Sequence, residues 1–292
     1  MKPLDTLLLI ILAAIWGSSF MFMRATAESF GPIALITVRV GVAALFLSVF
    51  LLTQSRRKEF IDNWFNLAWI GVINSALPFV LFAYASLSLS GGNVSLLNAI
   101  TPVLTTLIAH IWLKDRMTPW QFLGLGISIL GLLLLVWDKL EIGSPSLLPV
   151  LAGITAPLFY GFASNGTKKY LSGVTPLTAT AGSLFFATLF MLLLLPFFMP
   201  DFSKISNTDW LYALILGLVC TALAYLIFFR LILNIGPSRA VSVTFLIPIF
   251  AFLWGYLILD EVVTTKMWFA TAVILVGMSL VLRLVCTKQH KK

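Results

Sequence analysis

Charged residues are scarce in this chain. They make up 10% of its 292 residues, whereas apolar residues make up 60%. Soluble domains carry about 25% charged residues. A water-soluble fold of this size could not bury so much apolar surface, so the composition predicts an integral membrane protein.

Acidic residues are few, and none of the eleven falls in the middle of an apolar segment. All of them lie in expected loops or at the ends of expected helices. A charge in the middle of a membrane is costly, so a carboxylate that persists there is usually functional. The absence of an acid from the middle of every apolar segment argues against a proton-coupled or sodium-coupled site of the usual kind and against the paired acids of a hydrolase.

Cysteine and histidine are almost absent. Cys220 and Cys286 lie far apart in apolar segments, so we interpret both as small apolar fillers. His110 and His290 cannot build a metal site alone. Without a nucleophile motif or a phosphate-binding loop, the sequence predicts no catalytic residue, no metal and no cofactor. A membrane-embedded enzyme or a sensor remains as an alternative of another class.

The net charge of +8 comes from Lys and Arg in short loops between apolar segments. This arrangement suits membrane orientation and anionic lipid, and it offers no basic domain for nucleic acid. Most of these residues lie on one side of the expected membrane, and only Lys139, Lys204 and Lys266 lie on the other. We therefore expect both termini in the cytoplasm, with the protein in a bacterial inner membrane.

Apolar runs of about twenty residues are long enough to cross a bilayer as helices. The chain contains ten, at approximately 5–25, 32–53, 64–88, 92–113, 119–137, 147–169, 176–199, 208–233, 237–258 and 264–285. We take the first as a membrane helix and not as a cleaved signal, because it lacks a cleavage site of small residues.

The chain also repeats itself. Residues 64–137 align without a gap on 210–283 at an offset of 146, which places Pro102 on Pro248 and Asp115 on Glu261. Because five crossings per half is an odd number, the second half would enter from the opposite side. The predicted fold is therefore an all-α integral membrane protein with ten transmembrane helices in two inverted five-helix repeats. The units are 1–137 and 147–292, joined by the loop 138–146.

Neutral polar and aromatic residues recur at equivalent depths of the expected helices. Prolines accompany them, and a proline inside a helix frees a carbonyl that must find a partner or line a cavity. We predict helix breaks at Pro78, Pro102 and Pro248. The predicted substrate-binding residues are Trp16, Ser19, Asn74, Tyr84, Asn98, Thr101, Tyr160, Asn165, Tyr225, Thr244 and Trp254.

Two of these assignments have alternatives. Arg39 is the one cation clearly inside a span. It either clamps a substrate carboxylate, or it extends towards the outer surface or bonds to carbonyls at a helix end. Small polar residues can instead join helices, which is our interpretation of Ser75 and Thr221 in the matched segments that follow Gly71 and Gly217.

The sequence contains a set of short motifs, namely Trp16-Gly17-Ser18-Ser19-Phe20, Arg39 with the apolar run after it, Tyr84-Ala85-Ser86, Thr101-Pro102, Leu113 to Pro119, Gly124, Gly131, Pro248, Trp254-Gly255, Leu259-Asp260-Glu261 and Gly277. Taken together, these motifs resemble the EamA-type transporters of the drug/metabolite transporter superfamily, over nearly the whole chain. The chain departs from that pattern at Lys114-Asp115, where the family usually has Gly-Glu, and in Ser90-Gly91-Gly92-Asn93.

The resemblance implies an inner-membrane exporter or exchanger of small metabolites, such as amino acids or toxic analogues, that works by alternating access. Facilitated exchange is expected, with a proton-coupled exporter as the alternative. The expected partners are a small-molecule substrate and membrane lipid, with no nucleic acid, and the protein would be a monomer or a weak homodimer. Phosphorylated sugars suit it less, because a dianion needs several cations and only Arg39 lies inside.

Overall fold

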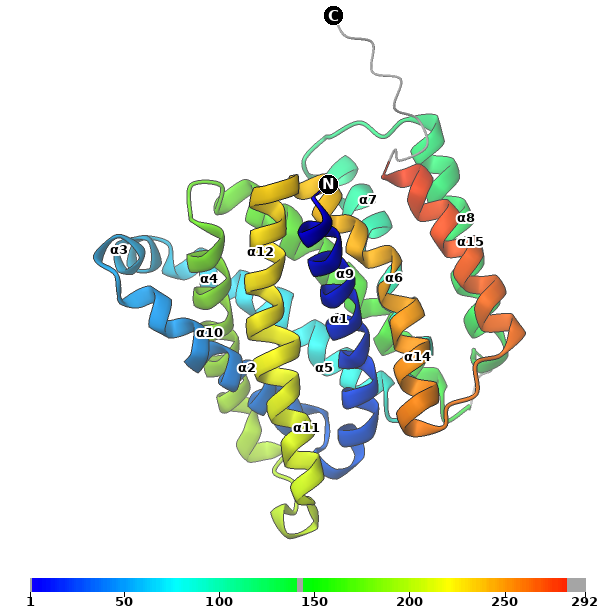
Figure 1. Ribbon diagram of the computed structural model, residues 1–292, viewed down its shortest axis with the longest axis horizontal. Helices are drawn as coiled ribbons and strands as arrows, with labels where there is room; N and C mark the ends of the chain where they lie inside the picture. The colour runs from blue at the N-terminus through cyan, green and yellow to red at the C-terminus, as the bar shows by residue number, and fades with distance from the viewer. Residues whose placement is uncertain (1, 141–143, 283–292) are drawn as a thin grey trace, which may run out of the picture.

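The computed structural model describes residues 2–140 and 144–282, and every regular element within these ranges is a helix (Figure 1). Residues 283–285 of the last expected span lie outside the described residues, as do Cys286 and His290. The prediction of an all-α protein is therefore confirmed.

Among the described residues, eight helical stretches are long and apolar enough to cross a membrane, and α14 and α15 are shorter apolar helices. The protein is thus a multi-pass membrane protein, while the count of ten crossings stays a prediction. The α-helices are α1 (Pro3–Phe30), α2 (Pro32–Ser48), α3 (Gln54–Asp62), α4 (Trp64–Gly71), α5 (Leu77–Ala85), α6 (Gly91–Ala99), α7 (Thr101–Trp112), α8 (Pro119–Val136), α9 (Leu147–Tyr170), α10 (Pro176–Leu194), α11 (Asn207–Gly217), α12 (Ala224–Ile235), α13 (Pro237–Ala240), α14 (Ile247–Leu259) and α15 (Thr265–Val281).

Helix starts follow from local chemistry. Pro32, Pro119 and Pro176 each occupy the first position of a helix, where the missing N–H of proline costs nothing. At the start of α11, Ser206 and Asp209 cap each other: the Asp209 N–H donates to Ser206 Oγ at 3.1 Å, and the Ser206 N–H donates to the Asp209 carboxylate at 3.2 Å.

Two of the expected continuous spans contain a π-helical turn, which hydropathy did not predict. The turn η2 (Val72–Ala76) joins α4 to α5, and η6 (Leu218–Leu223) joins α11 to α12. Pro78 follows η2 closely, and its missing N–H disturbs the regular ladder of the helix there. Such turns are rare and occur frequently at functional sites. The first residues of the two turns, Val72 and Leu218, are 146 positions apart, which is the offset of the internal repeat.

Two other expected spans are interrupted. The span 92–113 divides at Ile100 into α6 and α7. The span 237–258 divides into α13, the 3-10 turn η7 (Val241–Phe245) and α14. Pro102 and Pro248 stand directly after these breaks, so each begins the new helix instead of interrupting an existing one.

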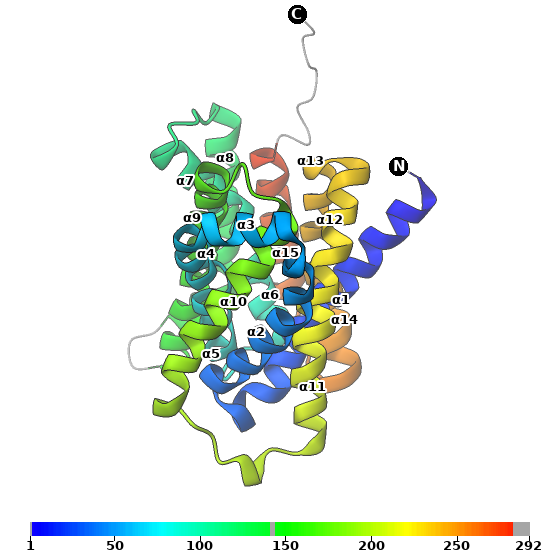
Figure 2. The same cartoon turned by 90° about the vertical axis from the view of Figure 1, so that its left-hand side faces the viewer.

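The helix α3 was expected to be a loop, because its residues are mostly charged. It lies across the neighbouring helices at the edge of the bundle (Figure 2). Phe60 secures it: its ring stacks on Phe186 at 5.5 Å and meets Phe185 edge-on at 5.6 Å. The neighbouring Glu59 accepts a hydrogen bond from the Thr175 hydroxyl at 2.9 Å, so one aromatic ring and one carboxylate hold this polar helix against α10.

The bundle separates a lateral pair from a central group. The helices α8 and α15 run side by side at one edge in Figure 1 and pack closely along their length. Small residues allow this approach, because a Cβ on Gly124 would stand 2.5 Å from the carbonyl oxygen of Gly277. Most of the other helices surround the centre of the molecule, where the candidate site lies.

Candidate functional site

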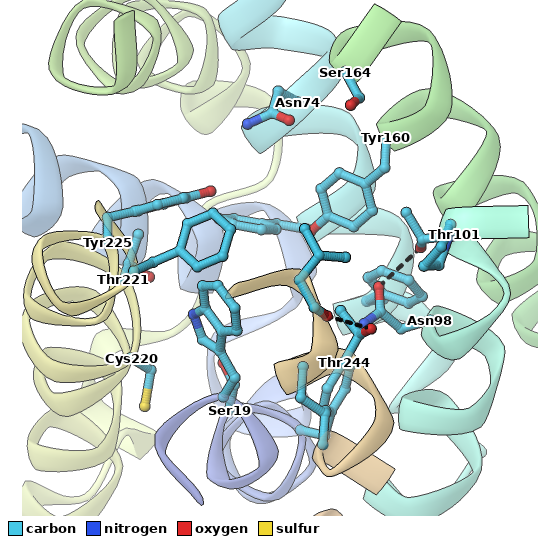
Figure 3. Close-up of a pocket in the computed structure, with 18 of the residues that line it drawn as sticks. Ser19, Asn74, Asn98, Thr101, Tyr160, Ser164, Cys220, Thr221, Tyr225 and Thr244 are labelled. Carbon is cyan, nitrogen blue, oxygen red and sulfur yellow. Dashed lines mark hydrogen bonds between the residues drawn. The ribbon is translucent and has the colours of Figure 1, made fainter. Parts of the chain in front are cut away.

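A cavity of about 440 Å³ lies among the central helices (Figure 3). Pockets of this volume accept small organic molecules. Both halves of the chain contribute to its wall: α1, α2, η2, α5, α6 and α7 from the first, and α9, η6, α12, η7, α14 and the end of α15 from the second.

Most of the predicted binding residues meet at this cavity, although they come from distant parts of the sequence. Figure 3 shows many of them around one space. The predicted residues that line it are Trp16, Ser19, Arg39, Asn74, Asn98, Thr101, Pro102, Tyr160, Tyr225 and Thr244.

Three predicted binding residues lie elsewhere. Trp254 donates its indole N–H to the carbonyl oxygen of Ala14 at 3.0 Å, which joins α14 to α1. Asn165 donates to the carbonyl oxygens of Thr105 and Gly161, both at 2.9 Å, which joins α9 to α7. Tyr84 is half-buried on α5 and is not among the lining residues, nor are Pro78 and Pro248.

The two helix breaks stand beside the cavity. At the first, Thr101 donates its hydroxyl to Asn98 Oδ1 at 3.3 Å. At the second, Thr244 donates its hydroxyl to the carbonyl oxygen of Val241 at 2.8 Å, and Figure 3 marks both bonds. Because Pro102 has no N–H, the regular helical bond to the Asn98 carbonyl is absent as well. The breaks thus add polar groups to the cavity wall from both halves.

Aromatic rings from both halves form much of that wall. Trp16 lies 5.2 Å from Phe228 and 6.3 Å from Tyr225, between ring centres. Across the cavity, Tyr160 lies 6.0 Å from Phe82 and 6.3 Å from Phe79. These distances are typical of edge-to-face and tilted aromatic pairs, so the rings hold one another in place.

Arg39 points inward and does not extend to the surface. Only 5% of the residue is exposed, and its Nε donates to the hydroxyl of Thr221 at 3.0 Å. One terminal nitrogen donates to Ser19 Oγ at 3.3 Å and the other to the sulfur of Met23 at 3.4 Å. Its guanidinium carbon stands 3.7 Å from the ring centre of Phe79. Through its bond to Arg39, Thr221 links η6 to α2, in line with its expected role of joining helices. It also lines the cavity.

The two ends of the cavity differ. At the end where α1 finishes, the Gly91 N–H donates to Glu261 Oε1 at 2.9 Å, and a Cβ on Gly92 would stand 2.6 Å from Phe252. These two contacts hold the start of α6 against α14 and the loop that follows α14. Towards the end where α1 begins, the lining includes Val241, Leu282 and the exposed Ser164.

Comparison with known proteins agrees with this architecture. The model of the EamA-like transporter family matches residues 5–137 and again residues 147–283. The chain belongs to the EamA-like transporter family.

Relatives of this EamA-like chain are distant but extend over most of its length. A Bacillus subtilis protein named as an uncharacterized transporter, YoaV, is 24% identical over 92% of this chain and 93% of its own. A protein of Streptantibioticus cattleyicolor named as a probable terminal-alkyne amino-acid exporter is 25% identical over 87% of this chain and 85% of its own. A crystal structure with 14% identity superposes with a TM-score of 0.69 over 99% of this chain and 100% of its own, which shows a shared fold. The family and the names of relatives point to a transporter and not to an enzyme.

Sequence reasoning missed the apolar part of the EamA-like cavity. Apolar residues fill a membrane protein everywhere, so nothing in the sequence marks those that face a cavity. Cys220, expected to be a filler, also lines it, with its sulfur 3.6 Å from Ser18 Oγ. The apolar lining residues that were not predicted for the site are Phe20, Met23, Phe79, Phe82, Cys220, Phe228, Val241, Ile247 and Leu282, and the polar ones include Thr105, Thr106 and Ser164.

The described residues of this transporter bring together no group of three or more His, Cys, Asp or Glu that could hold a metal. Neither Cys220 nor any lining residue stands in such a group. The cavity as described can therefore hold a molecule by apolar contact, hydrogen bonds and one cation.

Proposed function

We propose that this EamA-like protein is a secondary transporter that moves small organic metabolites across the bacterial inner membrane by alternating access. The observation that carries the proposal is the cavity, which both halves line and beside which a broken helix from each half stands. In many transporters the substrate binds near the midplane, between two repeats and beside discontinuous helices.

Features that recur 146 residues apart support the proposal of two inverted five-helix units, 1–137 and 147–292. The π turns begin at Val72 and Leu218, and the helix breaks fall at Ile100 and Leu246. Lys114, after α7, and Asp260, after α14, are the described non-glycine residues with positive φ, at 58° and 51°. Recurrence of such unusual backbone geometry favours two like-built units that cross the membrane ten times. The excess of Lys and Arg in the loops on one side supports the proposal that both termini face the cytoplasm.

The proposed substrates are amino acids or related compounds, exported or exchanged. The name of the Streptantibioticus relative favours this class. We propose that the substrate contacts the predicted residues that line the cavity, and that Asn165 and Trp254 hold helices together through their bonds to backbone carbonyls. Tyr84 lies outside the proposed contact set.

Facilitated exchange is the proposed mode, because no acid stands among the described residues that line the cavity. One observation favours the proton-coupled alternative. Asp5 on α1 is a carboxylate with only 4% exposure, and it accepts a hydrogen bond from Asn234 of α12 at 2.9 Å. A buried carboxylate that joins α1 of the first half to α12 of the second is where a coupled proton would bind.

The test is uptake of labelled amino acids into proteoliposomes, with and without a pH gradient. We expect saturable exchange that a pH gradient alone does not drive. Accumulation driven by the gradient, and abolished by Asp5→Asn, would instead establish the proton-coupled alternative.

The double variant Asn98→Ala with Thr244→Val should impair this transport at least about tenfold, because both helix breaks lose their polar side chains at the cavity. Expression and melting temperature should stay near those of the unaltered protein. Unchanged transport by the double variant would remove both residues from the site.

A further inference from the structure

Arg39 is the only charged residue among the described residues that line the cavity. We propose that it is the specificity-determining residue of the transporter, and that it selects monocarboxylates with an apolar or aromatic body, whether or not they carry an ammonium group. This inference rests on the proposed transport function and names the substrate class for the same cavity.

A buried cation without a counter-ion is costly. The residue is 5% exposed, and none of the ion pairs formed by the described residues includes it. A charge held in a membrane interior without a partner is usually functional, because burial of the charge destabilises the protein. A substrate anion would supply the missing countercharge in the loaded state.

The guanidinium group retains donors for such an anion. It has five N–H groups. Three of them donate to Thr221, Met23 and Ser19, and two are left without an acceptor among the described residues. A carboxylate can accept two parallel N–H bonds from one guanidinium group, which is the strongest geometry for this pair.

Three helical elements hold the side chain of Arg39 in place. Ser19 on α1 and Thr221 on η6 orient its nitrogen atoms, and Phe79 on α5 lies against the guanidinium group at 3.7 Å. Because α1 and α5 belong to the first half and η6 to the second, the anion would bind at the contact between the two halves. Its arrival and departure could then change how the halves pack.

The remaining lining defines the rest of the ligand. Trp16, Phe82, Tyr160 and Tyr225 provide aromatic faces for an apolar body. With one cation, the cavity suits a monoanion better than a dianion. It offers no described carboxylate to pair with an ammonium group, so the amino group of an amino acid would contribute little to affinity.

A structural role alone would make different predictions. If Arg39 served only to join α2 to η6, its replacement would lower stability, and ligand preference would not depend on a carboxylate. The two possibilities therefore separate in a ligand series on the unaltered protein, before any variant is made.

The experiment measures binding to the purified full-length protein by calorimetry, with 3-phenylpropionate, phenylalanine, phenylalaninamide and 2-phenylethylamine as probes. We expect 3-phenylpropionate and phenylalanine to bind within about tenfold of each other and the two probes without a carboxylate to show no measurable binding. Equal binding of 2-phenylethylamine and 3-phenylpropionate would overturn the proposal.

The variant Arg39→Gln should weaken binding of 3-phenylpropionate at least about thirty-fold. Arg39→Lys should recover part of the loss, because it keeps the charge but not the paired geometry. Arg230→Gln is the matched control, since Arg230 is exposed on α12 and lies outside the cavity. If Arg39→Gln does not fold, the ligand series alone decides.

Failure of the two proposals would look different. Carboxylate-dependent binding without any exchange in proteoliposomes would keep the anion site and overturn the transport function. Saturable exchange of amines and carboxylates alike, unaffected by Arg39→Gln, would keep the transport function and overturn the anion site.

Discussion

At the residue scale, adjacent side chains on α9 serve different purposes that the sequence could not distinguish. Ser164 lines the cavity, whereas Asn165 is buried and donates to the carbonyl oxygens of Thr105 and Gly161. Both are small polar residues in the same span. Only their positions around the helix, about 100° apart, decide which one meets the cavity and which one meets α7.

Asn165→Ala should therefore destabilise the protein by about 1–3 kcal/mol, because two hydrogen bonds in a buried contact are lost and a carbonyl of α7 is left without its partner. A thermal melt in detergent would measure this as a lower melting temperature. Ser164→Ala is the matched control and should leave the melting temperature unchanged. A larger loss from Ser164→Ala than from Asn165→Ala would contradict this assignment of roles.

The sequence predicted the polar part of the site much better than the apolar part. Asn98 and Thr244 are conspicuous in apolar spans, because an amide or hydroxyl in a membrane needs a partner. Phe79 and Phe228 carry no such signal, since an aromatic residue suits lipid, a helix contact or a cavity equally well. Arg39 was conspicuous too, but the direction in which its side chain points depends on hydrogen bonds to Thr221 and Ser19, which are distant in sequence.

At the scale of elements, α8 and α15 show how glycine sets the distance between helices. Gly124 stands where a Cβ would come within 2.5 Å of the Gly277 carbonyl oxygen, whereas Gly126, half a turn further on, has nothing within 4 Å of its Cβ position. The two residues share a helix and nearly the same membrane depth. They form a natural pair for comparing a close contact with an open face.

Gly124→Ala should lower stability by about 1–3 kcal/mol, because the backbone of α15 must move away. Gly126→Ala should be neutral or slightly stabilising, because alanine favours the helix by up to about 1 kcal/mol. Denaturation in detergent would compare the two variants. Equal destabilisation by both would show that the close approach of α8 and α15 does not matter for stability.

Helix positions were predictable to within a few residues, and their interruptions were less so. Apolar length marks a span. Pro102 and Pro248 stand directly after the two interruptions, whereas Pro78 lies inside the continuous helical stretch Trp64–Ala85. The helix α3 was missed because its charged residues are typical of a loop, and its anchor Phe60 is a single residue.

At the scale of the whole molecule, Glu261 accepts the Gly91 N–H at one end of the cavity, whereas the lining towards the end where α1 begins includes the exposed Ser164. Under the proposed orientation, this is an inward-facing arrangement. A cysteine at Ser164, in a background without Cys220 and Cys286, should react several-fold faster with a membrane-impermeant thiol reagent from the cytoplasmic side than from the outside.

Adding Glu261→Ala should raise labelling from the outside, because α6 loses its bond to the loop after α14. Ser95→Cys provides the control, since Ser95 is fully buried on α6 and should react from neither side. Faster labelling of the cysteine at position 164 from the outside would contradict the inward-facing assignment.

The π turns have a further consequence for how this chain tolerates change. A π turn holds one residue more than a regular turn, so deletion of a single residue within η6 would restore an ordinary α-helix. Five residues of a π turn rotate the chain about as far as four residues of an α-helix, so everything downstream would keep nearly the same orientation. Tyr225 and Phe228 would still face the cavity. A single-residue deletion in η6 should thus spare both membrane insertion and ligand binding, whereas one in the regular turns of α11 would rotate the two sides of the span by about 100° relative to each other.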